Sequence, residues 1–196
     1  WKEHDVDIVI DSSGIYDNVV NSYNLIKQGI NKVIITYSPN NSVDHTIIIG
    51  VNENSFDKSK HNIISSSICD ANACAPVLNI IDEEFGITDG FITTLHPWLG
   101  YQNLLDGSLK SVSSPGHYWS DFALGRSSTD SLIPKPTSLV STLQKVLPEC
   151  TNNIYAMSIR VPTSIVSASD MVLSLDKRIS LKIIEDVFQR LEYNYP

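Results

Sequence analysis

Cys69 and His96 are the residues of this 196-residue chain whose types and spacing best suit covalent chemistry. A thiolate attacks a carbonyl carbon readily, and a neutral imidazole can take up a proton and return it. Either residue by itself is more often structural, the cysteine as a buried thiol and the histidine as a satisfied core or surface residue. As a pair they predict a nucleophile, Cys69, and a proton acceptor, His96.

The charge beside the cysteine has two opposing sources. The residues that follow it predict a helix, because Val77, Ile80 and Phe85 recur at helical spacing. Cys69 then lies at the helix N-terminus, where unpaired amides and the helix dipole favour the thiolate by about 0.3–2 kcal/mol. The neighbouring carboxylate of Asp70 disfavours the thiolate by roughly 1 to a few kcal/mol. The two effects are of similar size.

Short strands and helices alternate before this helix, and longer strands follow it. The first part has the order strand, helix, strand, which is typical of a parallel sheet covered by helices. Its expected elements are the strands 6–11, 32–36, 46–49 and 62–65 and the helix 16–27. After the expected helix 69–84 we expect the strands 88–95, 155–161 and 165–175, the helices 139–146 and 181–191, and a surface loop over 107–126. The order predicts an α/β fold.

Short motifs recur along the chain in an order that resembles the glyceraldehyde-3-phosphate dehydrogenase family. The resemblance runs from Trp1 to about Leu181. The motifs are Ser12-Ser13-Gly14, Gly50-Val51-Asn52, Cys69 with Asn72 and Ala75-Pro76, Phe85-Gly86-Ile87, Thr93-Thr94-Leu95-His96, Gln102, Asp106-Gly107, Ile133-Pro134, Val146-Leu147-Pro148-Glu149 and Arg160-Val161-Pro162-Thr163. One such motif would be weak support, whereas the ordered series is strong.

The resemblance implies a fold, a domain division and an activity. Residues 1–68 would be the remainder of an NAD-binding domain, the C-terminal part of a Rossmann-type parallel sheet. Residues 69–196 would be an α+β catalytic domain with a mixed sheet, incomplete at its C-terminal end. The implied reaction is oxidation of a phosphorylated aldehyde through a cysteine thioester, with NAD (or NADP) as hydride acceptor. The family forms tetramers, so a homo-oligomer is expected. Erythrose-4-phosphate dehydrogenases share these residues, so the resemblance does not fix the substrate.

The residues that would hold phosphate are partly kept and partly replaced. By resemblance, Arg160 lies between two phosphate sites and Thr137 belongs to one of them. Arg126 is the nearest candidate for a further arginine of these sites. Asp70 stands where the family has a threonine that helps to bind inorganic phosphate, and Leu99 stands where it has a threonine for the substrate phosphate. A carboxylate at the first position repels phosphate.

Three further residues are implied to bind the cofactor, namely Ser13, Gly14 and Ser38. Ser38 lies in Tyr37-Ser38-Pro39, which replaces the family's Ser-Ala-Pro near the nicotinamide and is equally well read as an ordinary turn. The phosphate-binding fingerprint G-x-G-x-x-G is absent from this sequence. We therefore expect the chain alone to bind NAD poorly. The alternative function is a non-catalytic binding or assembly subunit derived from the family.

Composition excludes several other classes of protein. The net charge of −8 disfavours nucleic-acid binding, and no apolar run is long enough to suggest a membrane partner. An odd number of cysteines, three, disfavours a disulfide framework and favours a reducing compartment such as the cytoplasm. The spacing of Cys69 and Cys74 is not that of a zinc site, so no metal is expected.

Overall fold

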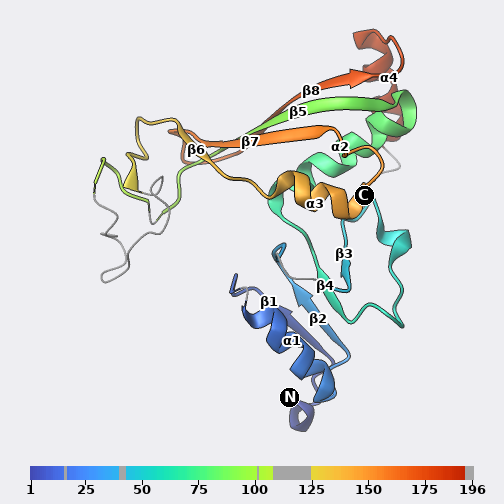
Figure 1. Ribbon diagram of the computed structural model, residues 1–196, viewed down its shortest axis with the longest axis vertical. Helices are drawn as coiled ribbons and strands as arrows, with labels where there is room; N and C mark the ends of the chain where they lie inside the picture. The colour runs from blue at the N-terminus through green and yellow to red at the C-terminus, as the bar shows by residue number, and fades with distance from the viewer. Residues whose placement is uncertain (16, 40–42, 101, 108–124, 193–196) are drawn as a thin grey trace. The chain divides into compact units, whose positions relative to one another are not determined.

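The computed structural model describes the chain except for residues 16, 40–42, 101, 108–124 and 193–196 (Figure 1). The chain divides into two compact units that interleave along the sequence. Unit 1 contains residues 1–88, 141–152 and 175–196, and unit 2 contains residues 89–140 and 153–174. None of the described helices has both the length and the apolar character that crossing a bilayer requires.

Unit 1 contains a four-stranded parallel sheet, sheet A, with the strand order β1-β2-β4-β3. Its strands are β1 (Ile8–Asp11), β2 (Lys32–Ile35), β3 (His45–Thr46) and β4 (Ile63–Ser65). Helix α1 (Asp17–Lys27) connects β1 to β2. Short 3-10 helices, η1 (Lys2–His4) and η2 (Glu53–Ser55), precede β1 and β4.

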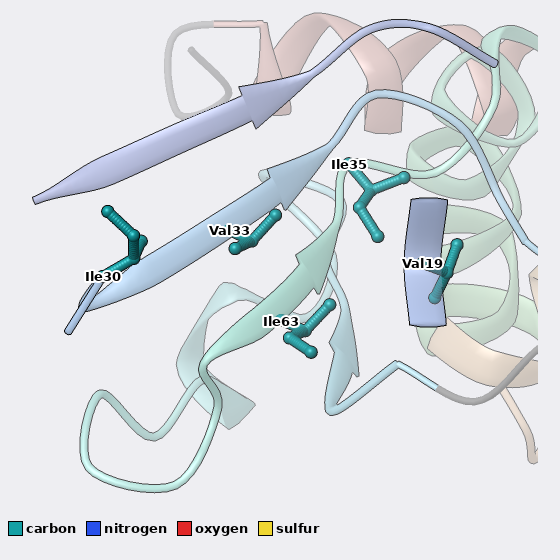
Figure 2. Packing of buried hydrophobic residues seen from close by; sticks show 5 residues of the cluster. All are labelled: Val19, Ile30, Val33, Ile35 and Ile63. Carbon is teal, nitrogen blue, oxygen red and sulfur yellow. The ribbon is translucent and has the colours of Figure 1, made fainter. Parts of the chain in front are cut away.

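Alternation along the strands forms the core of this sheet. Val33 and Ile35 of β2 are fully buried, and they pack with Val19 of α1 and Ile63 of β4 (Figure 2). Ile30 completes the cluster just after the helix. The helix ends where Gly29 adopts a φ of +101°, a left-handed conformation that glycine adopts without strain.

A second apolar cluster in unit 1 joins helices α2 (Cys69–Phe85) and α4 (Leu181–Leu191). Ile80 and Phe85 of α2 are buried with Val187 of α4. Arg190 of α4 pairs with the carboxylate of Glu84. Packing against α4 therefore fixes the C-terminal half of α2, while the N-terminus of α2 with Cys69 follows β4.

Unit 2 is built on the mixed sheet B, with the strand order β6-β7-β5-β8. The strands are β5 (Ile87–His96), β6 (Ile133–Lys135), β7 (Ile154–Arg160) and β8 (Ala168–Leu175), of which the end residues 87, 88 and 175 fall in unit 1. Strands β5 and β7 are parallel, and β6 and β7 are antiparallel. Helix α3 (Leu139–Val146) begins in unit 2 and continues in unit 1.

The predicted fold class is confirmed, since a parallel sheet precedes a mixed one. The helices α3 and α4 have the predicted bounds, and α2 ends one residue later than predicted. Helix α1 ends at the predicted residue, Lys27, and the predicted start at residue 16 lies outside the described residues. The functional boundary at residue 68 stays a prediction. Sheet A ends before it and sheet B begins after it, whereas the two compact units interleave. Most of the predicted loop over 107–126 lies outside the described residues.

Three details of the sheets differ from the prediction. Strand β3 ends at Thr46, because the amide side chain of Asn52 binds both the Thr46 carbonyl and the Ile48 N–H in place of a neighbouring strand. Strand β8 begins only at Ala168, because Val166 adopts a φ of +63°. Strand β6 was not expected; it lies at the sheet edge, where Pro134 is tolerated because no ladder donor is needed.

Candidate functional site

The turn between β4 and α2 fixes the position of Cys69. Ser65 Oγ donates to the Tyr37 carbonyl at 2.6 Å and accepts from the Ser67 N–H at 3.1 Å. The side-chain amide of Asn72 donates to the carbonyls of Ser66 at 3.0 Å and of Ile68 at 2.9 Å. These bonds hold the chain on both sides of the turn, so that Cys69 is the first residue of the helix.

The turn includes an unusual backbone conformation. Ser67 has a φ of +72°, which is rare for a residue other than glycine. Its side chain is only 1 % exposed, and its hydroxyl has no hydrogen-bond partner. A strained residue with an unsatisfied buried donor thus stands two positions before the cysteine. Such strain persists only where the surrounding structure imposes it.

The thiol of Cys69 is exposed and is held in its protonated form. Its Sγ donates to Asp70 Oδ1 at 3.6 Å. Partial burial of the sulfur raises the pKa of the Cys69 thiol, and the negative charge of Asp70 raises it further. Burial and the neighbouring carboxylate together keep Cys69, the predicted nucleophile, mainly as a thiol at neutral pH.

His96 is the last residue of β5, in unit 2. Its backbone carbonyl accepts from the Val161 N–H at 2.9 Å, and its Nδ1 lies 3.4 Å from Ser167 Oγ. Arg160 is the cross-strand partner of His96 on β7. Strand pairing thus brings together the predicted proton acceptor and one predicted phosphate-binding residue.

The predicted phosphate-binding residues differ in how many of their polar groups already have partners within the protein. Arg160 Nη1 donates to the Pro97 carbonyl at 2.8 Å, while its buried Nε has no partner. Thr137 Oγ1 accepts from the Leu139 N–H at 3.1 Å at the start of α3. Arg126 pairs with Asp106 at 3.3 Å on the surface, so its charge is already partly compensated. Asp70, in unit 1, contacts Cys69.

The three predicted cofactor-binding residues follow strands of sheet A. The Ser13 N–H and hydroxyl both donate to Asp11 Oδ1, at 2.9 and 2.6 Å. Gly14 has a φ of +70° and open space around the position of a Cβ. Ser38 is 7 % exposed, and its Oγ accepts from Thr142 Oγ1 at 3.1 Å. Ser38 is therefore engaged inside the protein.

Tyr37 is a residue of this region to which the sequence assigned no role of its own. Its hydroxyl lies 2.8 Å from the Ile15 carbonyl oxygen and 3.2 Å from Asp11 Oδ2, across the carboxyl ends of β1 and β2. Burial acts against the charge of Asp11, but the bonds from Ser13 and Tyr37 together lower the pKa of the carboxyl below its usual value. The sequence did contain a signal for this role, since Tyr37 stands where the resembled family has a serine.

Cys69 and His96 belong to different compact units, and each is held by contacts within its own unit. The order of the site residues along the chain can be compared with known proteins. Residues 66–194 match the family model for the C-terminal domain of glyceraldehyde 3-phosphate dehydrogenase. This match includes every predicted site residue from Cys69 to Arg160, and the predicted cofactor residues Ser13, Gly14 and Ser38 lie before it.

Curated relatives extend the match to nearly the whole chain. "Glyceraldehyde-3-phosphate dehydrogenase 2" of Bacillus subtilis is 34 % identical over 190 residues, which is 97 % of this chain and 53 % of that protein. The proteins of the same name from Streptomyces avermitilis and Trichormus variabilis are 33 % identical over 97 % and 98 % of the chain. The chain spans about half the length of these relatives. It belongs to the glyceraldehyde 3-phosphate dehydrogenase family.

Proposed function

We propose that this chain carries the catalytic part of an NAD-dependent (or NADP-dependent) enzyme that oxidises a phosphorylated aldehyde. The observation that carries the proposal is the exposed thiol of Cys69, fixed as the first residue of α2 by Ser65 and Asn72. His96 and Arg160, paired on β5 and β7, supply the second element of the site. The relatives are named as glyceraldehyde-3-phosphate dehydrogenases.

In the proposed reaction the Cys69 sulfur bonds to the aldehyde carbon and gives a hemithioacetal. His96 takes the hydroxyl proton while a hydride leaves the same carbon, and the carbonyl re-forms as a thioester. The backbone amide of Cys69, at the N-terminus of α2, would stabilise the oxyanion. Phosphate then attacks the thioester, the carbon–sulfur bond breaks, and the sulfur regains its proton from His96.

NAD would serve in this proposal as the hydride acceptor. The residues of this chain fit only part of such a group, because Ser38 is engaged with Thr142 and Tyr37 bridges the ends of β1 and β2. Gly14, with open space above its α-carbon, is the predicted cofactor residue that remains accessible. The phosphates of a dinucleotide would need a glycine-rich loop that this sequence does not contain.

Arg160 is the best-supported phosphate-binding residue of the proposal. A buried guanidinium donor without a partner is unusual, because desolvating a charged donor is costly unless a hydrogen bond replaces the lost water. An anionic substrate group is the natural acceptor for it. Asp70 and Leu99 would weaken the same sites, the first by repulsion and the second by the loss of a hydroxyl.

The second candidate function is a non-catalytic binding or assembly subunit. The observation that favours it is the contact of Cys69 with Asp70, which holds the sulfur as a thiol and places a negative charge where phosphate would approach. In this case the scaffold of the site would remain while its reactivity is lost.

A homo-oligomer is the assembly that we propose in either case. Phe91 and Tyr155 are paired across β5 and β7 and therefore lie on one face of sheet B, and both are exposed. Exposed apolar side chains gathered on one sheet face are typical of a contact surface. None of the three cysteines forms a disulfide in the structure, and the reducing cytoplasm is the location that we propose.

Trapping the covalent intermediate tests the enzymatic proposal directly. The chain is incubated without inorganic phosphate with glyceraldehyde 3-phosphate and with NAD in large excess, which offsets the poor binding expected of the chain alone. Its peptides are then analysed by mass spectrometry. We expect an acyl adduct on Cys69 that phosphate removes, and no adduct in Cys69→Ser. Asp70→Thr/Leu99→Thr should accumulate more adduct, because a repelling charge is gone and two hydroxyl donors are present. Absence of the adduct from both the wild type and the double variant would favour the assembly subunit.

A further inference from the structure

Ser167 contacts the imidazole of His96 although the two residues are 71 positions apart. The contact follows from the pairing of β5 with its neighbour β8. Ser174 Oγ donates to Asp89 Oδ1 at 3.1 Å, and Leu173 lies against Gly90. The same number of residues separates Asp89 from His96 and Ser167 from Ser174. Ser167 thus continues the antiparallel register of β8, and the sheet itself places its hydroxyl beside His96.

The turn directly before Ser167, which contains Val166, has a strained backbone. Val166 has a φ of +63°, a conformation that β-branched residues rarely adopt, and its side chain is 75 % exposed. Packing of the side chain therefore does not explain the conformation. A side-chain hydrogen bond spans the turn, since Thr163 Oγ1 donates to the Ile165 carbonyl at 3.2 Å.

The same turn is bonded to the segment that follows His96. The Trp98 N–H donates to the Thr163 carbonyl at 3.2 Å, and the Val161 N–H donates to the His96 carbonyl at 2.9 Å. Bonds of β7 and the following turn thus hold the backbone on both sides of the imidazole, and Ser167 meets its ring. Backbone strain is often found beside functional residues, where it helps to fix the position of a side chain.

An imidazole that accepts a proton needs a lone pair on one nitrogen and carries its proton on the other. The hydrogen bond at one nitrogen determines which of the two is free. Ser167 Oγ, 3.4 Å from Nδ1, can accept a hydrogen bond from this nitrogen. Nε2 would then carry the lone pair.

We propose that Ser167 is a positioning residue, which accepts a hydrogen bond from Nδ1–H of His96 and so leaves the lone pair for proton uptake on Nε2. The inference rests on the proposed function for the identity of the proton, which would come from the hemithioacetal hydroxyl. When Nε2 is protonated, Nδ1–H still donates to Ser167, so the ring keeps its orientation. The strained turn at Val166 holds the hydroxyl in place.

Nitrogen NMR of the imidazole rings tests this inference in the full chain without substrate. The His96 signals are assigned with a His96→Gln variant. We expect the wild type to carry its ring proton on Nδ1 and Ser167→Ala to lose this signal in favour of Nε2–H. Ser167→Thr, which restores a hydroxyl, should retain Nδ1–H, and the nearby exposed Ser164→Ala should match the wild type. A proton on Nε2 in the wild type, or identical spectra for Ser167→Ala, would overturn the proposal.

A second variant tests the strained turn separately. Val166→Gly keeps the hydroxyl but releases the backbone, so we expect a weaker Nδ1–H signal in a chain that remains folded. An unchanged signal would mean that the turn does not hold Ser167. Because these spectra need no turnover, a chain with the expected signals but without the acyl adduct on Cys69 would retain the positioning role and refute the proposed enzyme. An adduct with unaffected spectra would do the reverse.

Discussion

The turn before Cys69 and the turn before Ser167 each hold a residue of the proposed site in position, but through different hydrogen bonds. Each contains a residue other than glycine with a left-handed φ, Ser67 at +72° and Val166 at +63°. Ser67 is buried and Val166 is exposed. In the first turn the side chains of Ser65 and Asn72 hold the backbone. In the second the Thr163 hydroxyl donates to the Ile165 carbonyl, and the Thr163 carbonyl accepts from the Trp98 N–H of the segment after His96.

The two turns also differ in what surrounds the residue that they hold. At the buried turn, bonds of Ser65 and Asn72 hold the backbone, while a separate residue, Asp70, brings a negative charge to Cys69, the proposed nucleophile. At the exposed turn the strand register fixes the contact of Ser167 with His96. Placement of the reactive groups is therefore separable from their reactivity, and the two can be tested by different substitutions.

The largest expected effect concerns the three cysteines. Iodoacetamide near neutral pH should label Cys69 well before Cys74, which is fully buried, and before Cys150. Burial and then the charge of Asp82 raise the pKa of Cys150 to about 11, which lowers its thiolate fraction roughly a hundredfold or more relative to an ordinary thiol. Peptide mass spectrometry over time measures the three rates. Equal labelling of Cys69 and a buried cysteine would contradict its assignment as the nucleophile.

Replacing the strained residue of the buried turn should stabilise the fold. Ser67→Gly relieves a strain of about 1–3 kcal/mol and removes an unpartnered buried hydroxyl worth about 1–3 kcal/mol, against an entropic cost of about 0.5–1 kcal/mol for glycine. We expect the free energy of unfolding in urea to rise by about 1–3 kcal/mol. Ser67→Ala removes only the hydroxyl and should gain less. A loss of stability in Ser67→Gly would mean that the hydroxyl is needed.

Removing the charge beside the nucleophile should shift its titration. The pKa of Cys69 is raised, so its alkylation rate increases only at a higher pH than for an ordinary thiol. Asp70→Asn should move this curve to lower pH and speed labelling at neutral pH, because the negative charge that disfavours the thiolate is gone. Part of the elevation should remain, since burial is the larger cause. Asp70→Glu keeps the charge and is the control; a shift in both variants would exclude the charge as the cause.

Local patterns predicted the elements of the site, but pairing across the chain determined its contacts. The spacing of apolar residues placed Cys69 at the start of α2, and adjacency alone revealed the effect of Asp70. The cofactor-binding role of Ser38 stays a prediction, and its bond to Thr142, 104 residues away, is a contact that no local pattern contains. The pairing of Ser167 with His96 depends on the register of β8 on β5 in the same way.

The backbone conformations of the two turns were also invisible in the sequence. Left-handed φ values are usually signalled by glycine, as at Gly29 and Gly86, and neither strained position carries one. Val166 in addition lies in a stretch whose residues favour a strand, so the sequence extended β8 by three residues at its N-terminal end. Local preference there is overridden by the bonds that tie the turn to the segment after His96.

The smallest expected effect is the change in the free energy of unfolding when Val166 of the exposed turn is replaced. Val166→Gly relieves a strain of about 1–3 kcal/mol, loses almost no packing because the side chain is exposed, and costs about 0.5–1 kcal/mol in chain entropy. We expect a gain of about 0.5–1 kcal/mol in the free energy of unfolding. Ile165→Gly is the matched control, since Ile165 is 70 % exposed and is not among the residues with positive φ. It should lose about 0.5–1 kcal/mol, because it has only the entropic cost of glycine. Equal losses in the two variants would show that Val166 is not strained, and the likeness between the two turns would then fail.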